Sequence, residues 1–399
     1  MNMKYRELCG EKVSLLGFGM MRLPLLEDKS IDQEQVNRMA DYAIEHGVNY
    51  FDTAYPYHDG YSEISLGEAL DKYPRNTYYV ADKFPGHQFM SEYDCERIFD
   101  EQLKRCRVDY FDFYLLHNVC ENSMPTYTNE DFGIIEYFAE QKRCGRIKHL
   151  GLSTHANADN LEEILDFIEG KLGEKPDFCQ IQLNYIDWTL QDAKKKVDIL
   201  NARGIPIIVM EPLRGGKLAD TGEDNNAKLK ALRPDDSIAS WALRWIEQVE
   251  GVKVILSGMS AFDQMKDNIR TFSEGEELND AELGLLDEIA DTLKSGVPCT
   301  ACRYCCEGCP MELDIPTLLA GYNDLKFQTT LTVPMMMDET PEDKWPDKCI
   351  GCGACSAVCP QQIDIPEALR AFTELLEKAP NWRQICKERE EAAERLRQG

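Results

Sequence analysis

The sequence is short of positive charge. Its 399 residues include 44 Lys and Arg against 71 Asp and Glu, which gives a formal net charge of −27 at pH 7. Nucleic acids and anionic membrane surfaces select for Lys and Arg, so this acidic balance argues against either as a partner. The sequence also has no apolar run near the roughly 20 residues that span a bilayer. Its first residues, MNMKYRELCG, contain no apolar signal-peptide core. We therefore expect a cytoplasmic protein that binds neither nucleic acid nor membrane.

A dinucleotide-binding fingerprint is missing as well. A doubly wound nucleotide-binding sheet usually carries Gly-x-Gly-x-x-Gly between its first strand and first helix. The nearest match, Gly17-Phe-Gly19-Met-Met-Arg22, lacks the third Gly and runs into MRLPLLEDKS rather than into a helix. We therefore reject it as a fingerprint of that fold.

Within residues 1–290, predicted strands alternate with predicted helices. Short runs rich in Val, Ile, Tyr and Phe indicate strands that helices cover on both faces. They lie at 13–19, 49–53, 77–83, 110–117, 149–153, 178–186, 205–211 and 252–258. Amphipathic stretches lie between them, and several end in Gly, as helices often do. Eight strand–helix units favour an α/β fold of the (β/α)8 TIM barrel type over an open sheet.

Four polar residues follow successive strands of this predicted barrel. Asp52 and Tyr57 come at and after the end of the second strand, Lys83 ends the third, and His117 ends the fourth. Each alone has a more common structural explanation, such as a helix cap, a packed ring or a solvated charge. Chemistry in such barrels takes place at the carboxyl ends of the strands. Because the four residues share that edge, and Lys83 stands in an apolar run, we interpret them as catalytic.

This set of residue types suits the reduction of a carbonyl by hydride. The reaction forms an alkoxide that needs a proton, and a Tyr with a pKa near ~10 gives one reluctantly at neutral pH. An adjacent ammonium such as that of Lys83 lowers the pKa of the phenol. The Asp52 carboxylate can hold the ammonium in place, and His117 can hydrogen-bond the substrate oxygen.

The motifs that carry these residues resemble those of the aldo-keto reductases. They are FDTAYPY (51–57), YSE (61–63), ADK (81–83), YLLHN (114–118), GLS (151–153), GIPIIVMEPLRGGKL (204–218) and ALRW (242–245). The resemblance implies a barrel that binds NAD(P)H across its carboxyl face, with Asp52, Tyr57, Lys83 and His117 as the catalytic tetrad. It also implies that Ser153 and Gln180 hold the nicotinamide carboxamide. The other cofactor-binding positions that it implies are Gly19, Met20, Met210, Leu213, Gly258, Gln264, Asp267 and Asn268.

Two departures from the family pattern concern the cofactor. Met210 stands where an aromatic residue usually stacks on the nicotinamide. Gly258 and Gln264 stand where basic residues clasp the 2′-phosphate of NADP. Without a cation there, a phosphate dianion gains little, so we expect no strong preference for NADPH. Lys266 and Arg270 are nearby and are the candidates that would compensate.

The cysteines are concentrated near the C-terminus. Nine of the sixteen lie in the 61 residues from 299 to 359, and eight of these nine form two copies of Cys-x2-Cys-x2-Cys-x3-Cys-Pro. This is the spacing of bacterial ferredoxins with two [4Fe–4S] clusters, in which each fourth Cys ligates the other cluster. The predicted ligand sets are Cys299, Cys302, Cys305 and Cys359, and Cys349, Cys352, Cys355 and Cys309. Zinc is the alternative, but it would leave the third Cys of each copy and the Cys-Pro unexplained.

The repeat continues beyond the cysteines. CPMELDIPTLL (309–319) matches CPQQIDIPEAL (359–369), and a long helical spacer at 315–327 resembles that of the α-helical ferredoxins. We expect a small, mainly α-helical ferredoxin-like domain at 296–375 and a charged, solvated C-terminal helix at 376–399. Cys306 and Cys386 fit no ligand position and are predicted to be free thiols.

The sequence thus predicts an oxidoreductase that transfers hydride between NAD(P)H and an aldehyde or ketone, so its substrate is a small carbonyl or alcohol. Hydride carries two electrons and each cluster passes one, a difference that a flavin normally bridges. No flavin motif is present, but the sequence alone does not exclude a bound flavin. The clusters either serve a redox partner protein or are structural. The rival function is a ferredoxin-like electron carrier whose barrel is a docking platform. Residues that could line the substrate pocket are Met20, Met21, Tyr55, His87 and Trp188.

Overall fold

The computed structural model describes residues 3–293, 296–299, 301–327 and 331–398. The chain divides into two compact units. Met1–Ile289 and Arg389–Gly399 form the first unit, and Ala290–Glu388 forms the second. The first unit is therefore discontinuous in sequence, because the chain returns to it after the second.

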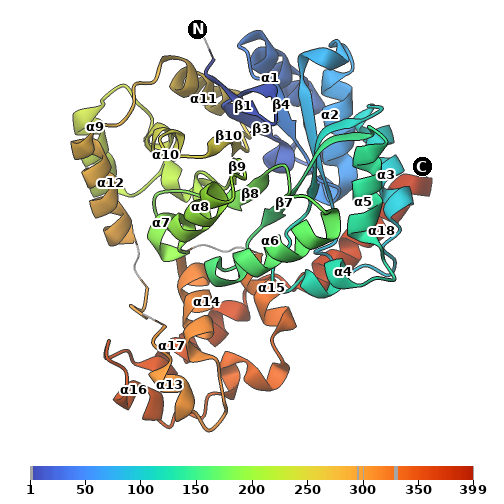
Figure 1. Cartoon of the computed structure of the whole chain (residues 1–399). Coiled ribbons are helices and arrows are strands. Elements are labelled where there is room, and N and C mark those ends of the chain that lie inside the picture. The colour runs from blue at the N-terminus through green and yellow to red at the C-terminus, as the bar shows by residue number, and fades with distance from the viewer. Residues whose placement is uncertain (1–2, 294–295, 300, 328–330, 399) are drawn as a thin grey trace. The chain divides into compact units, whose positions relative to one another are not determined.

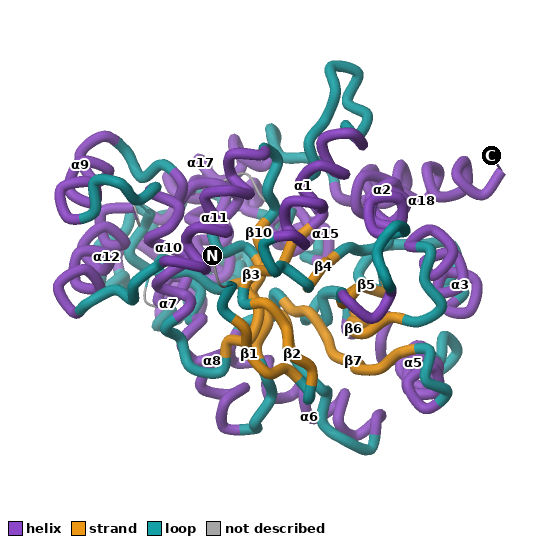
Figure 2. The backbone as a smooth tube through the Cα atoms, turned by 90° about the horizontal axis from the view of Figure 1, so that it is seen from above, coloured by secondary structure: helices purple, strands orange, loops and turns teal. Residues whose placement is uncertain are grey.

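The first unit contains a closed barrel of eight parallel strands, as the sequence predicted (Figure 1). Figure 2 shows the strands surrounded by helices. In chain order the barrel strands are β3 (Leu16–Gly19), β4 (Tyr50–Asp52), β5 (Tyr79–Phe84), β6 (Phe111–Leu116), β7 (Ile147–Thr154), β8 (Cys179–Gln182), β9 (Ile207–Met210) and β10 (Val252–Ser257). β10 pairs with β3 and closes the ring. Each barrel strand overlaps one predicted run, although the runs 13–19 and 178–186 are longer than the strands β3 and β8 within them.

The helices of this unit follow the strands and cover the outside of the barrel. They are α1 (Gln33–Glu45), α2 (Tyr61–Leu70), α3 (Cys95–Cys106), α4 (Met124–Thr128), α5 (Ile134–Arg143), α6 (Ala158–Leu172), α7 (Asp187–Leu190), α8 (Ala193–Ala202), α9 (Glu223–Leu232), α10 (Ile238–Glu247), α11 (Phe262–Glu274) and α12 (Asp280–Leu293). Asp side chains start two of them, since Asp32 accepts from the Gln35 amide and Asp94 from the Arg97 amide.

Two predicted strands differ from those observed. The run 13–19 is divided, because residues 11–14 form β2 (Glu11–Ser14) and pair with β1 (Tyr5–Leu8), while residues 16–19 pair with the barrel. The run 178–186 ends early, at Gln182. There the Asn184 side chain accepts hydrogen bonds from the amides of Ile186 and Asp187, which turns the chain into α7. Local side-chain bonds thus override the apolar pattern.

The second unit is built on two longer helices, α14 (Ile315–Phe327) and α17 (Ile365–Leu376), whose apolar faces share one core. The shorter elements are α13 (Tyr304–Glu307), α15 (Thr332–Glu339) and α16 (Ala354–Ala357). The predicted helical spacer at 315–327 is confirmed as α14. Among the described residues, no helix combines the length and apolarity needed to cross a membrane.

The last helix, α18 (Trp382–Gln398), differs from the prediction of a solvated tail. A helix is present, but Cys386 is 1% exposed, and Ala392 and Ala393 are also buried. Residues from Arg389 onward belong to the first unit. The high charge of this segment suggests solvent on all sides, yet its two alanines give it a narrow packing face.

Candidate active site and cysteine cavities

Asp52 and Lys83 form a buried ion pair at the carboxyl ends of neighbouring strands. Asp52 is the last residue of β4 and pairs in register with Ala81 of β5, two positions before Lys83. Lys83 Nζ lies 2.5 Å from Asp52 Oδ1 and donates to the Thr53 carbonyl at 2.6 Å. Burial lowers the pKa of Lys83, but the charge and hydrogen bond of Asp52, together with the smaller effects of Tyr57 and Asp82, outweigh it, and the net pKa is raised. Lys83 is therefore an ammonium, fixed by two acceptors.

Tyr57 lies directly over this pair. It begins the short helix η2 (Tyr57–Gly60), and Lys83 Nζ is 5.0 Å from the centroid of its ring. Burial raises the pKa of Tyr57, and the nearby Lys83 opposes that effect without reversing it. The expected net lowering is therefore wrong for the protein alone, because loss of water around the phenol outweighs the ammonium. Tyr57 is held as a neutral phenol that can donate a proton.

His117 completes the group. It follows β6, and its ring lies 6.0 Å from the Tyr57 ring and 4.2 Å from the His87 ring, measured between centroids. Burial lowers the pKa of His117 well below its ordinary value and that of His87 to about 3. Both imidazoles are therefore neutral at physiological pH. Whereas Asp52 and Lys83 are buried, Tyr57 and His117 are partly exposed. The two groups that would meet a substrate are thus the accessible ones.

A buried polar network behind Lys83 was not found from the sequence. The Gln102 amide donates to the Lys83 carbonyl at 3.1 Å and to Glu63 at 3.2 Å. Glu63 in turn pairs with Arg105 at 2.9 Å. Gln102 and Arg105 come from α3 and Glu63 from α2, so two outer helices fix the position of the β5 strand end. The signal available in the sequence was Glu63 within YSE, but its partners are far away in the chain.

The three residues expected at the nicotinamide lie together at the ends of neighbouring strands. Ser153 of β7 pairs in register with Gln180 of β8, and Gln180 Nε2 contacts the Met210 sulfur of β9 at 3.5 Å. Gln180 Oε1 is buried and has no hydrogen-bond partner within the described part of the chain. A carboxamide NH₂ would satisfy this acceptor. The donor and acceptor set therefore fits a nicotinamide amide.

The expected phosphate and adenine positions have partners within the protein. The Gln264 side chain accepts from the Ser260 and Ala261 amides at the start of α11. Asn268 donates to the Ser257 hydroxyl at 2.8 Å, and Asp267 accepts from Ser237. These residues hold the turn from β10 into α11. The remaining predicted positions are dispersed: Gly19 ends β3 in register with Asp52, Met20 is buried, and Leu213 is partly exposed.

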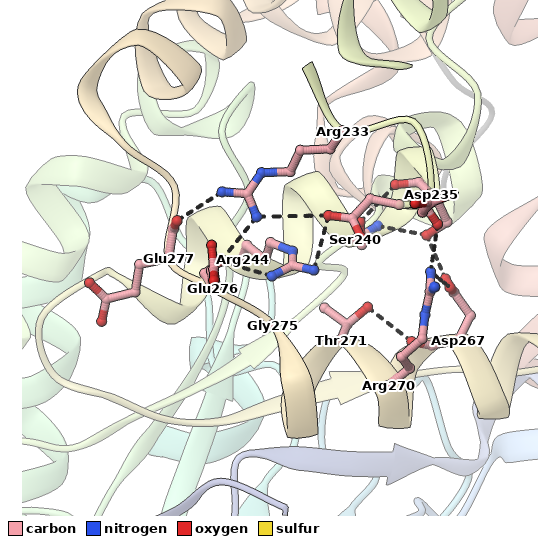
Figure 3. Close-up of polar contacts among 12 residues, drawn as sticks. Arg233, Asp235, Ser240, Arg244, Asp267, Arg270, Thr271, Gly275, Glu276 and Glu277 are labelled. Carbon is pink, nitrogen blue, oxygen red and sulfur yellow. Dashed lines mark hydrogen bonds and ion pairs between the residues drawn. The ribbon is translucent and has the colours of Figure 1, made fainter. Parts of the chain in front are cut away.

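The cations near this turn are largely engaged. Arg270 donates to the Asp235 carbonyl at 2.9 Å and pairs with Asp267 at 3.2 Å (Figure 3). Lys266 pairs with Asp263 at 2.7 Å. Arg22, which the sequence did not suggest, lies next to Gly258: a Cβ built on that glycine would be 3.3 Å from the Arg22 Cβ. The glycine therefore leaves room for an arginine from another loop.

The suggested pocket residues have different environments. Tyr55 is buried and its hydroxyl donates to Glu101 at 3.0 Å, whereas Met21 is 49% exposed. Trp188 packs edge-on against Trp245, 5.2 Å between centroids. Met20 is buried, and the His87 ring lies against the His117 ring of the candidate tetrad.

In the second unit, the cysteines surround two cavities. One is lined by Cys299, Cys302, Cys305 and Cys359. The other is lined by Cys309, Cys349, Cys352 and Cys355. In each cavity, three cysteines of one repeat meet the fourth of the other, which is the grouping that the ferredoxin spacing predicted.

The donor set of both cavities fits an iron–sulfur cluster. Four thiols face each cavity, and the remaining lining includes apolar residues such as Leu319 and Leu369. Within the described residues, no three His, Cys, Asp or Glu converge closely enough for a single metal ion. Zinc needs four ligands at about 2.0–2.3 Å around one point, whereas a cluster occupies a larger volume between its thiolates. The arrangement favours the cluster.

Comparison with known proteins defines the class. Residues 15–291 match the model of the Aldo/keto reductase family, and residues 298–363 match that of the 4Fe-4S dicluster domain. The chain belongs to the aldo/keto reductase family. It is an NAD(P)H-dependent oxidoreductase with an appended iron–sulfur domain.

Its relatives extend over the barrel. The chain is 27% identical to L-galactose dehydrogenase of Arabidopsis thaliana, over 67% of this chain and 87% of that protein. It is 26% identical to an NADH-specific methylglyoxal reductase of Escherichia coli, over 62% and 85%. Among solved structures, an aldo-keto reductase of Bacillus halodurans aligns with a TM-score of 0.57 and 24% identity, covering 72% of this chain and 96% of that one. This last likeness concerns the fold alone.

Proposed function

We propose that Tyr57, Lys83, Asp52 and His117 catalyse the reduction of a small aldehyde or ketone, and the reverse oxidation of an alcohol. The observation that carries this proposal is the buried Asp52–Lys83 pair beneath a partly exposed, protonated Tyr57. Tyr57 donates its phenolic proton to the substrate oxygen as negative charge develops there. Lys83 stabilises the phenolate that is left, and neutral His117 hydrogen-bonds and orients the same oxygen.

NAD(P)H supplies the hydride when bound. Ser153 and Gln180 are assigned to its carboxamide, and Met210 packs against the ring as a flexible, polarisable side chain. Gly19, Met20, Leu213, Gly258, Gln264, Asp267 and Asn268 are assigned to the rest of the cofactor. We expect no strong preference for NADPH, since Lys266 and Arg270 are already paired with carboxylates. A relative that is named as NADH-specific agrees with this expectation.

For the second unit we propose two [4Fe–4S] clusters, one in each cysteine-lined cavity. Residues 1–290 would then carry out hydride transfer, and residues 296–375 would pass single electrons to a redox partner protein. We also propose a cytoplasmic location, because cysteines that bind iron–sulfur clusters must not be oxidised to disulfides, which favours reducing surroundings.

The proposal is tested by Tyr57→Phe, which removes one oxygen and keeps the ring. Reduction of aldehydes and ketones should fall by about 10²- to 10⁴-fold, the contribution of a positioned general acid. The dissociation constant for the nicotinamide cofactor and the visible spectrum of the clusters should stay unchanged. Tyr61→Phe, which alters an exposed tyrosine on α2, is the matched control. Full activity in Tyr57→Phe would refute the tetrad assignment.

A further inference from the structure

The two cysteine cavities are built from matching positions of one repeat. Residues 299–319 correspond one by one to residues 349–369, without a gap. The short helices α13 and α16 begin at equivalent places in the two repeats and lie beside each other in the second unit (Figure 1). We call the cavity that contains Cys299 the first cavity and the one that contains Cys349 the second cavity. Each can be compared with the other, position by position.

Much of the lining is the same in both cavities. Four cysteines line each of them. Pro316 and Leu319 line the first cavity, and the corresponding Pro366 and Leu369 line the second. A difference between two clusters held there must therefore come from the positions at which the repeats diverge.

Three of the diverging positions make the first cavity more polar. At each of them the first cavity is lined by a side chain with an N–H or O–H donor, and the corresponding residue has no such donor. The pairs are Arg303 and Gly353, Tyr304 and Ala354, and Gln361 and Met311. Apart from its thiols, the second cavity has no side-chain donor among the described residues that line it.

Arg303 occupies a position whose backbone favours glycine. Its φ is 64°, in the left-handed region that strains a side chain, and Gly353 has a φ of 74° at the same place in the other repeat. Residues in such conformations are concentrated at functional sites. The arginine therefore indicates a role for its charge at the first cavity.

The other cations near the cavities do not line them. Lys344 and Lys348 lie close to the second cavity in sequence or in space, but both pair with carboxylates and neither belongs to its lining. Arg303 pairs with Asp314 at 3.1 Å and also lines the first cavity. Among the described residues, it is the one Lys or Arg that lines either cavity.

We propose that the two clusters differ in reduction potential, and that the cluster in the first cavity is the more easily reduced. The inference rests on the two clusters proposed above. Reduction adds one electron, and thus one negative charge, to a cluster. A neighbouring cation and hydrogen-bond donors favour that reduced form. At equilibrium an electron on the second cluster therefore passes to the first, so that the second is oxidised and the first is reduced by one electron each.

The test is a redox titration of the full-length, anaerobically purified protein, followed by electron paramagnetic resonance of the reduced clusters. The wild type should show two midpoints. Arg303→Gly copies the second repeat and relieves the strained φ. It should lower the higher midpoint by about 3- to 10-fold in the equilibrium constant, where tenfold is about 59 mV for a one-electron couple, and leave the lower midpoint unchanged.

The reciprocal variant is Gly353→Arg, which should raise the lower midpoint. A Cβ built on Gly353 meets no atom within 4 Å, so the cavity wall has room for the side chain. Arg370→Ala is the matched control, because the Arg370 side chain is 60% exposed, against 59% for Arg303, and lines neither cavity. Both midpoints should stay unchanged in this control.

Iron and sulfide analysis separates failure of the clusters from failure of the inference. If the wild type binds less iron and sulfide than two clusters require, the proposed clusters fail and the inference with them. If both clusters are present but titrate at one midpoint, the inference alone is wrong. It is also wrong if Arg303→Gly lowers the lower midpoint instead, or moves neither.

Discussion

The two units place their reactive groups in different ways. In the first unit, Asp52 and Lys83 stand on hydrogen-bonded strands, and a network through Gln102 and Glu63 fixes them from behind. In the second unit, the cysteines stand on loops and on four-residue helices, α13 and α16, around cavities. The backbone of the first site is therefore supported by protein alone. The backbone of the second site depends on the cluster that fills each cavity, because cluster binding and folding are coupled when loops supply the ligands.

The strongest test of this comparison is the Asp52–Lys83 pair. Lys83→Met leaves a carboxylate buried without its partner, which should lower the free energy of unfolding by about 3–5 kcal/mol. The double variant Lys83→Met with Asp52→Asn removes both charges and should recover most of that stability, while carbonyl reduction stays low. Chemical denaturation followed by fluorescence measures the stabilities. If the double variant is as unstable as Lys83→Met alone, the ion pair does not account for the stability of the strand ends.

The second test concerns the cavities. Cys359→Ser should lose about half of the bound iron, because each cavity is proposed to hold one of two clusters. Adding Cys302→Ser should remove no more, since both residues line the same cavity, whereas adding Cys349→Ser should remove the rest. Iron and sulfide analysis of anaerobically purified protein measures this. Cys306→Ser is the control and should keep all the iron.

A contrary result would also be clear. If Cys359→Ser and Cys349→Ser remove the same half of the iron, each repeat binds its own cluster and the interleaved grouping is wrong. Zinc in place of iron would refute the cluster proposal for that cavity.

A smaller effect is expected in the choice of cofactor. The dissociation constants of NADH and NADPH should differ by less than about 10-fold, because the cations near the 2′-phosphate position are shared with carboxylates. Arg22→Ala should weaken NADPH more than NADH if the arginine beside Gly258 contributes. Fluorescence titration of both cofactors decides this. A preference for NADPH of 100-fold or more, with roughly that much lost in Arg22→Ala, would assign the phosphate site to Arg22.

The smallest expected effect is that of pH. His117 and His87 have lowered pKa values, the latter about 3, so both are neutral throughout the neutral range. Tyr57 has a raised pKa and keeps its proton. Carbonyl reduction should therefore vary less than about threefold between pH 6 and 9 and decline only where Tyr57 ionises. A transition near pH 6.5 in the rate profile would mean that His117 acts in its protonated form.

Much of the barrel was predictable because its signals are local. The runs that contain Asp52, Lys83 and His117 at or near their ends are apolar and short, and parallel strands bring their carboxyl ends to one edge. The cysteine groups were predictable for the same reason, since spacing within each repeat carries the information. What the sequence did not reveal depends on long-range contacts: Gln102 behind Lys83, and Arg22 beside Gly258. The sign of the Tyr57 pKa shift was also missed, because burial is a property of the folded chain.

The discontinuity of the first unit has a consequence for how the protein is made. Arg389–Gly399 leaves the ribosome only after the 99 residues Ala290–Glu388. At roughly 5–20 residues per second, this segment therefore arrives about 5–20 s after the barrel sequence is complete. During that interval the nascent barrel has its strand-end residues but lacks Arg389. A chain whose synthesis stops before Arg389 would therefore carry the barrel without the part of α18 that contacts Gly60, Ser91 and Glu101.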